Sequence, residues 1–232
     1  MSKKVIFCTP TRAKPSQQYL DSLAASVPIL DAAGWEHGTV YEIGCPYISH
    51  ARSKALRKAL DAGATAVVFI DDDLSWRPED LLRLIETEGD VISGVYRFKK
   101  EPEEYMGAVI VNNDGTPKLR DDGCIEAHSI PAGFLKVTRE GVNRFMKAWP
   151  ELIYGEACNP HVDLFNHGAS GGVWWGEDYA FARRWREKCG SIWIVPDLQL
   201  DHYSGDTCYP GNFHNFLCRQ PGGSEDTERT KP

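Results

Sequence analysis

The sequence predicts an α/β fold with a mostly parallel central sheet, helices on both faces and a smaller β-rich region in the second half. The first hundred residues alternate between apolar strands and amphipathic helices, which is typical of doubly wound sheets. The run TAVVFIDDD at 65–73 is continuously apolar before its acidic end, as expected for a strand buried on both faces. A chain of 232 residues with 42% hydrophobic and 25% charged residues can bury such a core.

Local signals in the first half support the type of each element. The segment 49–63 begins with Ser49, which can cap a helix, and its interior is rich in Ala, Leu, Lys and Arg. The segment 77–89 has acidic residues in its expected first turn and a glycine at its end. We expect strands over 3–10, 38–44, 65–73 and 90–100, and helices over 16–34, 49–63 and 77–89.

The second half is richer in turns and loops. An Asn-Asp-Gly sequence predicts the turn of a hairpin over 107–119. Residues 155–173 show no periodicity, and we expect a long loop there. The remaining expected elements are a strand pair over 124–138, helices over 140–149 and 176–190, a closing strand region over 191–205, and a disordered polar tail over 221–232.

Charge and hydropathy bear on several functional classes. The net charge of −7 argues mildly against broad nucleic-acid binding, which needs clustered Lys and Arg. No apolar run approaches the length of a membrane-spanning helix, and the apolar part of the N-terminus is too short for a signal peptide. We therefore expect a cytoplasmic protein, or one in the host cytoplasm if it is viral, with its seven cysteines reduced.

Three consecutive carboxylates, Asp71, Asp72 and Asp73, follow the apolar strand. Ligands of open α/β sheets bind beyond the carboxyl ends of the strands, and carboxylates there can bind a hard divalent cation. The alternative is that one Asp caps the next helix and the others are solvated. His202 also follows an apolar strand, and neutral imidazole is a competent metal ligand, although a lone His is more often structural.

The order of these motifs resembles the GT-A glycosyltransferases, which have a Rossmann-like fold and use nucleotide sugars. The similarity spans roughly residues 4–206, nearly all of the chain before the tail. FIDDD resembles the D-x-D motif of that family, with Asp71 and Asp73 as its outer acids. The other landmarks occur in the family's order and are TPTR at 9–12, HARSKAL at 50–56, SGVYRFK at 93–99, IPAGFLKVTREGV at 130–142, WWGEDYAF at 174–181 and LDHYSG at 200–205.

The resemblance implies a donor site. Asp73 and His202 would hold Mn²⁺ or Mg²⁺ on the diphosphate of a nucleotide sugar, for which a UDP-sugar is the expected donor. Asp71 would contact the ribose or the water shell of the metal. Arg52 would reach the phosphates, unless it is simply a solvated helix charge. The other residues assigned to donor binding are Thr9, Pro10, Arg12 and Asp72, of which Asp72 has no specific role.

The resemblance also implies an acceptor site and a single domain over 1–220, with a nucleotide-binding half at about 1–100 and an acceptor half at about 101–220. Asp178 would act as catalytic base and favour inversion, with Glu177 assisting. Both acids could instead only complement the dipole of the helix that they begin. Trp174 and Trp175 could stack on the acceptor, and the loop 155–173 could close as a lid.

The acceptor could be a saccharide or a hydroxymethylated DNA base, as for the glycosyltransferases of some viruses. Compactness and two basic clusters favour DNA, whereas the acidic net charge favours the saccharide, which we place first. The clusters are Arg97, Lys99 and Lys100, and Arg183, Arg184, Arg186 and Lys188. A non-catalytic nucleotide-sugar binder is a further alternative, and a nucleotidyltransferase is disfavoured because TPTRAKP lacks a Gly-rich phosphate loop.

A competing metal site is also conceivable from ligand types alone. His202, Cys208, His214 and Cys218 are all side chains that can bind zinc, but their spacing matches no standard zinc finger. If these four residues formed a structural zinc site, His202 could not serve a catalytic metal.

Overall fold

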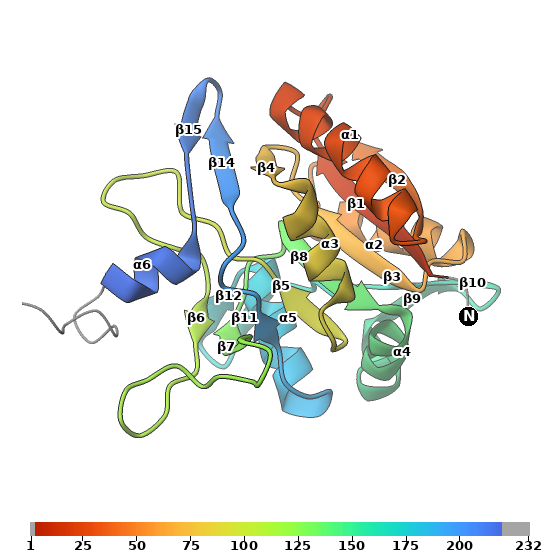
Figure 1. Cartoon of the computed structure of the whole chain (residues 1–232). Coiled ribbons are helices and arrows are strands. Elements are labelled where there is room, and N and C mark those ends of the chain that lie inside the picture. The colour runs from red at the N-terminus through yellow and green to blue at the C-terminus, as the bar shows by residue number, and fades with distance from the viewer. Residues whose placement is uncertain (1–2, 220–232) are drawn as a thin grey trace, which may run out of the picture.

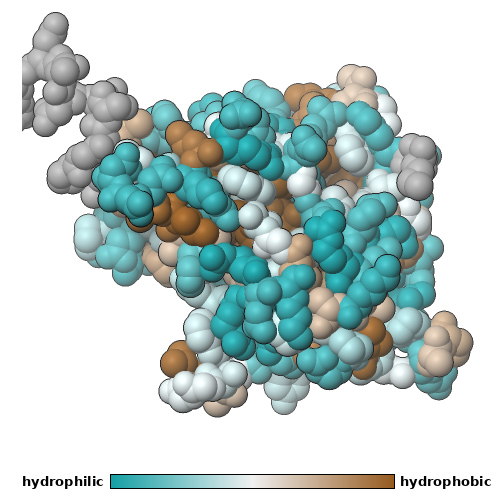
Figure 2. Space-filling view, turned by 90° about the horizontal axis from the view of Figure 1, so that it is seen from below, coloured by the Kyte–Doolittle hydropathy of each residue, from teal (hydrophilic) through white to brown (hydrophobic). Residues whose placement is uncertain are grey.

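The structure is a computed structural model that describes residues 3–219. Helices and short strands pack around one large eight-stranded sheet (Figure 1). The expected disordered tail at 221–232 lies outside the described residues. None of the helices in the described part of the chain combines the length and apolar character that crossing a membrane requires. The face seen in Figure 2 is mostly hydrophilic, with small separated hydrophobic patches.

The N-terminal part of the sheet is parallel, as predicted. β1 (Lys4–Thr11) lies between β2 (Glu36–Ile43) and β3 (Ala66–Ile70) and pairs with both in parallel. The connections are α1 (Gln17–Ala32) and α2 (Ile48–Asp61). Ser16 caps α1 by accepting a hydrogen bond from the backbone N–H of Tyr19, which satisfies one of the free donors of the first turn. The three parallel strands therefore end at the same edge of the sheet.

The complete sheet is mixed, with the order β2-β1-β3-β8-β5-β13-β7-β6. β8 (Phe134–Thr138) inserts antiparallel between β3 and β5 (Val91–Ser93), and β13 (Trp193–Ile194) pairs in parallel with β5. The predicted α/β class is confirmed, but fewer of the strand pairs are parallel than expected. The strands expected as a pair over 124–138 form, but they do not pair with each other. β8 pairs with β3 and β5 instead, and these partners could not be read from local sequence.

Alternate residues of the central strands pack on opposite faces of the sheet, as the two-residue period of a strand requires. In β3, Val67 and Phe69 join one core cluster while Val68 and Ile70 join the other. α2, α4 (Arg139–Ala148) and α5 (Glu177–Lys188) contribute to the first cluster. α1 and α3 (Pro78–Glu86) contribute to the second, and Figure 1 shows these two helices on the same side.

The remaining elements are short and mostly peripheral. A three-stranded sheet of β15, β14 and β4 stands beside the main sheet and carries His202. The bounds are β4 (Leu74–Trp76), β6 (Ala108–Val109), β7 (Ile125–Ser129), η1 (Pro150–Leu152), β9 (Ile153–Glu156), β10 (Asn159–Val162), β11 (Gly168–Ser170), β12 (Val173–Trp175), β14 (Leu200–Ser204), β15 (Thr207–Tyr209) and α6 (Phe213–Arg219).

Three expected elements differ from the structure. The strand expected over 90–100 covers only β5, because the chain leaves the sheet at Gly94, where a β-carbon would crowd Leu200 and Phe134. The hairpin expected over 107–119 has few strand residues, namely β6 and an isolated bridge between Val111 and Pro117. The segment 155–173 is not a plain loop, since it contributes to two small antiparallel hairpins, β9-β10 and β11-β12, whose exposed residues give no apolar pattern.

Candidate functional site

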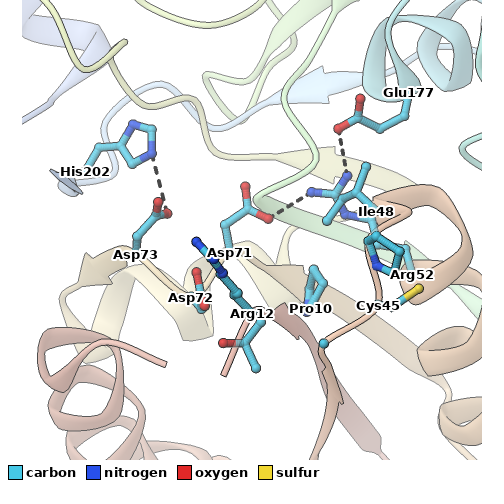
Figure 3. A pocket seen from close by; sticks show the side chains of 13 residues that line it. Pro10, Arg12, Cys45, Ile48, Arg52, Asp71, Asp72, Asp73, Glu177 and His202 are labelled. Atoms are coloured by element: carbon cyan, nitrogen blue, oxygen red, sulfur yellow. Dashed lines mark hydrogen bonds and ion pairs between the residues drawn. The ribbon is translucent and has the colours of Figure 1, made fainter. Parts of the chain in front are cut away.

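A cavity of 590 Å³ lies at the carboxyl edge of the parallel strands. Figure 3 shows that the acidic triplet projects into it from the end of β3, opposite the first turn of α5 and beside β14. This is the edge where ligands of α/β sheets bind. The lining residues are Pro10, Thr11, Arg12, Gly44, Cys45, Pro46, Ile48, Arg52, Asp71, Asp72, Asp73, Glu177 and His202.

Asp71 is held in one orientation from both sides. Its Oδ1 accepts a hydrogen bond of 2.8 Å from Nη2 of Arg52, and its Oδ2 accepts one of 3.1 Å from the hydroxyl of Tyr96. Its backbone N–H donates to the carbonyl of Gly133 at 2.9 Å. A methyl group at Gly133 would collide with both the Tyr96 hydroxyl and the Asp71 carboxylate. The glycine therefore allows the close approach that fixes Asp71 at the cavity.

Arg52 joins the acidic triplet to α5. Its Nη1 also donates to Oε1 of Glu177 at 3.2 Å, and its side chain is only 3% exposed. Burial alone would lower the pKa of Arg52, but the carboxylates of Asp71 and Glu177 outweigh that effect and raise it. The guanidinium also lies 5.2 Å from the ring centre of Phe165, and its Nε is buried without a partner among the described residues.

Asp73 and His202 face each other across the cavity. Nδ1 of His202 lies 2.9 Å from the carbonyl oxygen of Arg97, which can only accept, so Nδ1 carries the proton. Nε2 lies 3.5 Å from Oδ1 of Asp73; it donates to the carboxylate when the ring is protonated and offers a lone pair to a cation when the ring is neutral. A metal-binding histidine usually donates its other ring N–H to a backbone carbonyl or a carboxylate in this way.

Lys99 occupies the other side of Asp73. Its ammonium pairs with Oδ2 of Asp73 in a short contact. Burial would raise the pKa of Asp73, but the hydrogen bonds and charges of His202 and Lys99 lower it, so the carboxylate is ionised. Lys99 thus supplies a positive charge at the carboxylate that the resemblance assigns to a metal.

The residues present fit a divalent cation bound by two protein ligands. Two ligand atoms bound to one Mg²⁺ at about 2.1 Å lie roughly 3 Å apart when they occupy neighbouring octahedral positions, so the observed 3.5 Å needs only a small adjustment. Across residues 3–219 no group of three or more His, Cys, Asp or Glu is placed to hold a metal. A cation at Asp73 and His202 would therefore take its other ligands from a bound substrate or water.

Asp72 projects into the same cavity but is the least engaged member of the triplet. Burial raises its pKa, and the charges of Asp73 and Asp71 raise it further. Its backbone is nevertheless fixed, because its carbonyl accepts a hydrogen bond of 2.9 Å from the N–H of Ser16. Its side chain keeps acceptor capacity for a polar group that enters the cavity.

The two acids that begin α5 have different surroundings. Glu177 lines the cavity and pairs with Arg52, whereas Asp178, the predicted base, is partly buried and is not among the lining residues. Burial, followed by the charge of Glu177, raises the pKa of Asp178 to about 6. Oδ1 of Asp178 accepts a hydrogen bond of 2.8 Å from the N–H of Tyr179. A carboxylate with this pKa can accept a proton near neutral pH.

Not all predicted site residues reach the cavity. Pro10 and Arg12 line it, but Thr9 is fully buried, and its hydroxyl is 2.6 Å from the hydroxyl of Tyr19. Thr11 lines the cavity in its place, and its hydroxyl lies near the carboxylate of Asp72, whose pKa it lowers against the larger effect of burial. Pro10, Arg12, Arg52, Asp71–Asp73, Glu177 and His202 are brought together.

The two tryptophans lie on β12, outside the lining of the cavity. Trp174 is 70% exposed, and Trp175 packs against the guanidinium of Arg183, whose Cζ lies 4.9 Å from the ring centre. Both residues directly precede the first turn of α5, which carries Glu177 and Asp178. They therefore border the approach to these two acids.

The alternative zinc ligands do not assemble. Sγ of Cys218 lies 3.6 Å from Nε2 of His214, while His202 faces Asp73 and Cys208 is exposed on β15. Among the described residues the arrangement therefore leaves His202 available to the cavity.

Lys99, Tyr96 and Gly133 were missed as site residues by sequence reasoning. Lys99 and Tyr96 lie in SGVYRFK, for which the sequence predicts a strand. The chain instead leaves the sheet after β5, and this turns both side chains toward the triplet. The IPAG sequence could have marked Gly133, because a glycine within a strand pair often signals close backbone approach.

Comparison of the sequence with protein-family models finds no match, and a search of curated proteins finds none either. Among solved structures, A197 from STIV is similar, with a TM-score of 0.51 and 16% sequence identity. The similarity covers 87% of this chain and 86% of A197. The chain has the expected α/β fold, with an architecture similar to that of A197.

Two further structural matches have lower scores. One is the catalytic domain of Drosophila beta1,4galactosyltransferase 7 in complex with xylobiose, at a TM-score of 0.41 and 16% identity over 80% of this chain. The other is GalNAc-T7 with UDP, GalNAc and Mn²⁺, at a TM-score of 0.46 and 11% identity over 87% of this chain. This chain spans 61% and 44% of those two chains.

Proposed function

We propose that the protein is a glycosyltransferase that moves a sugar from a nucleotide-sugar donor to a hydroxyl group. The observation that carries this proposal is the pairing of Asp73 with Nε2 of His202, whose other ring nitrogen is held by a backbone carbonyl, in a cavity at the strand ends. The GT-A-like fold is consistent with it. A binder that only holds the nucleotide sugar would have no use for a partly buried carboxylate of raised pKa, so Asp178 favours an enzyme.

The donor is proposed to lie along the cavity with its diphosphate near Asp73 and His202. Mn²⁺ or Mg²⁺ held by these two residues would stabilise the negative charge of the departing nucleoside diphosphate. Asp71 is oriented by Arg52 and Tyr96 to accept hydrogen bonds from ribose hydroxyls. Pro10, Thr11 and Arg12 provide one wall for the nucleoside, and we propose a UDP-sugar as the donor.

The acceptor is proposed to approach from the side of β12 and α5. Asp178 takes the proton from the attacking hydroxyl, and Glu177 keeps Arg52 and the first turn of α5 in place. A base that is separate from the leaving group favours inversion at the anomeric carbon. We propose a saccharide-type acceptor, and hydroxymethylated DNA is the second acceptor to test.

The proposal is tested by donor turnover. Purified protein is incubated with a panel of nucleotide sugars and Mn²⁺ or Mg²⁺, and release of the nucleoside diphosphate is measured with and without acceptors. We expect metal-dependent release that is lost in Asp73→Asn and His202→Ala. Asp201→Asn is the matched control, because Asp201 neighbours His202 on β14 but is absent from the cavity lining. Neither donor binding nor release with any donor would refute the proposal.

A further inference from the structure

A second, smaller cavity of 50 Å³ lies between the β11-β12 hairpin and α5. This exceeds the volume of about 10–15 Å³ that a cavity needs to hold one water, so the cavity can admit a small polyatomic group. Residues of both elements line it, together with the segment that precedes β11, and they include Ser170, Trp175, Arg183 and Arg184. None of these residues lines the larger cavity.

Arg183 is a cation without a counter-charge in this cavity. Among residues 3–219 its one side-chain contact is with the ring of Trp175, and its Nε is buried without a hydrogen-bond partner. A buried polar group without a partner is costly, and most such groups in proteins are satisfied by protein, water or a ligand. The guanidinium of Arg183 is therefore available to an anion that enters the cavity.

The plane of Arg183 is fixed before any ligand arrives. Its guanidinium lies over the ring of Trp175, and Nε1 of Trp175 donates to the carbonyl of Ser170 at 3.2 Å, which holds the ring against the hairpin. Arg184 already has a partner in the cavity wall, because its Nη2 donates to Oδ1 of Asn166 at 3.0 Å. Arg184 adds positive charge to the cavity, while Arg183 has the free donors that bind an oxyanion in a forked geometry.

The position of this cavity relates it to the acceptor. Trp175 is separated from Glu177 by Gly176 alone, so the cavity adjoins the first turn of α5 and the proposed base Asp178. We propose that Arg183 and Trp175 form an oxyanion subsite that binds a carboxylate or a phosphate group of the acceptor. The link to the acceptor rests on the proposed glycosyl transfer, whereas binding of the oxyanion does not.

The subsite is tested directly with inorganic phosphate and acetate as separate probes. Each is titrated into ¹⁵N-labelled protein while the side-chain Nε–H resonances of the arginines are followed by NMR. We expect a saturable shift of the Arg183 resonance with at least one probe. Saturation by phosphate alone indicates a phosphate group on the acceptor, and saturation by acetate alone indicates a carboxylate. No saturable shift with either probe, or only the non-specific drift of an adventitious ion, would overturn the proposal.

Variants separate the subsite from the general positive charge of α5. We expect Arg183→Gln to weaken binding of the saturating probe at least ten-fold, and Arg183→Lys to give an intermediate loss because the fork is gone but the charge remains. The matched control is Arg186→Gln, which removes the same charge from the same helix but lies outside the cavity lining. Binding in these variants is followed by calorimetry, and equal weakening by the control would also overturn the proposal.

The subsite and the proposed function can fail independently. Saturable anion binding without turnover of any nucleotide sugar would keep the subsite and refute glycosyl transfer. Turnover of a nucleotide sugar without saturable anion binding would keep glycosyl transfer and refute the subsite. If both hold, Arg183→Gln should raise the KM for an anionic acceptor while acceptor-independent hydrolysis of the donor stays unchanged. Thermal unfolding of each variant, monitored by circular dichroism, shows whether it keeps the fold.

Discussion

At the scale of single residues, Asp73 already has a cationic partner, with which a divalent metal ion would have to compete. The carboxylate is shared between His202 and Lys99, and both lower its pKa. The ammonium of Lys99 neutralises the charge that a divalent ion would otherwise meet. Lys99 must therefore release Asp73, at least in part, when a metal binds, and its positive charge is then free for the phosphates of the donor.

We predict that Lys99→Met increases the affinity for Mn²⁺ in the absence of donor. The ion pair is partly exposed, with side-chain exposures of 30% and 33%, so its loss changes the free energy of binding by about 0.5–1 kcal/mol. The expected gain is about two- to five-fold, measured by calorimetric titration of Mn²⁺. Lys100→Met is the control, because Lys100 pairs with Glu104 and not with the triplet. Unchanged or weaker Mn²⁺ binding in Lys99→Met would show that the two cations do not compete.

At the scale of elements, the first turn of α5 places two carboxylates next to each other with opposite consequences for stability. Glu177 is compensated by Arg52, whereas Asp178 is partly buried without a cation. The N-terminus of a helix favours negative charge, but the raised pKa of Asp178 shows that burial and the charge of Glu177 outweigh this benefit. Ionisation of Asp178 therefore lowers the free energy of unfolding of the protein.

We predict that activity and stability respond to pH in opposite directions. The base must be unprotonated, so transfer should rise as the pH increases through about 6. The folded state holds the proton of Asp178 more tightly than the unfolded chain. The contribution of Asp178 to the free energy of unfolding is therefore fully present below the ordinary pKa of 3.8 and is lost as the pH rises to about 6.

The same argument predicts opposite effects for neighbouring substitutions. At pH 8, Asp178→Asn should raise the free energy of unfolding by about 1 kcal/mol, after discounting for solvent screening, while abolishing transfer. Glu177→Gln should lower it, because Arg52 loses one of its two partners. Urea unfolding at pH 8 measures both. A less stable Asp178→Asn would mean that the charge of Asp178 is favourable in the folded protein.

At the scale of the whole molecule, Arg52 connects distant parts of the chain around the cavity. It projects from α2, and its two carboxylate partners lie at the end of β3 and at the start of α5. The arginine is almost fully buried, while both partners are partly exposed. A single side chain thus joins two elements of the first hundred residues to the helix that carries the proposed base.

We predict that Arg52→Met lowers the free energy of unfolding by about 2–3 kcal/mol, somewhat less than the loss of one partner of a fully buried pair. The carboxylates of Asp71 and Glu177 would remain in a partly buried site without their common cation. Urea unfolding measures the change, and Arg83→Met serves as the control because its pair with Asp197 is well exposed. Equal effects of the two substitutions would show that the Arg52 connection contributes no more than a surface ion pair.

The sequence was sufficient to predict the helices and strands whose type follows from local residue patterns. The apolar run of β3, the composition of α2, and the acidic first turns of α3 and α5 all predict their elements. The expected cap of α2 by Ser49 is wrong, because the helix begins one residue earlier and Ser49 lies inside it. The approach of Asp71–Asp73, Glu177 and His202 at one cavity followed from a family resemblance and not from spacing. Lys99 and Tyr96 could not be assigned, because their orientation depends on where the chain leaves the sheet after β5.

The position of β8 has a consequence for how the chain folds during its synthesis. Residues 134–138 form hydrogen bonds to β3 and β5, which were made more than forty residues earlier. Until β8 leaves the ribosome, the facing edges of β3 and β5 have no partner, and an unpaired apolar edge promotes association with other chains. The first hundred residues therefore cannot close their own sheet, and a stop or pause in translation before residue 134 leaves a nascent chain with two open edges.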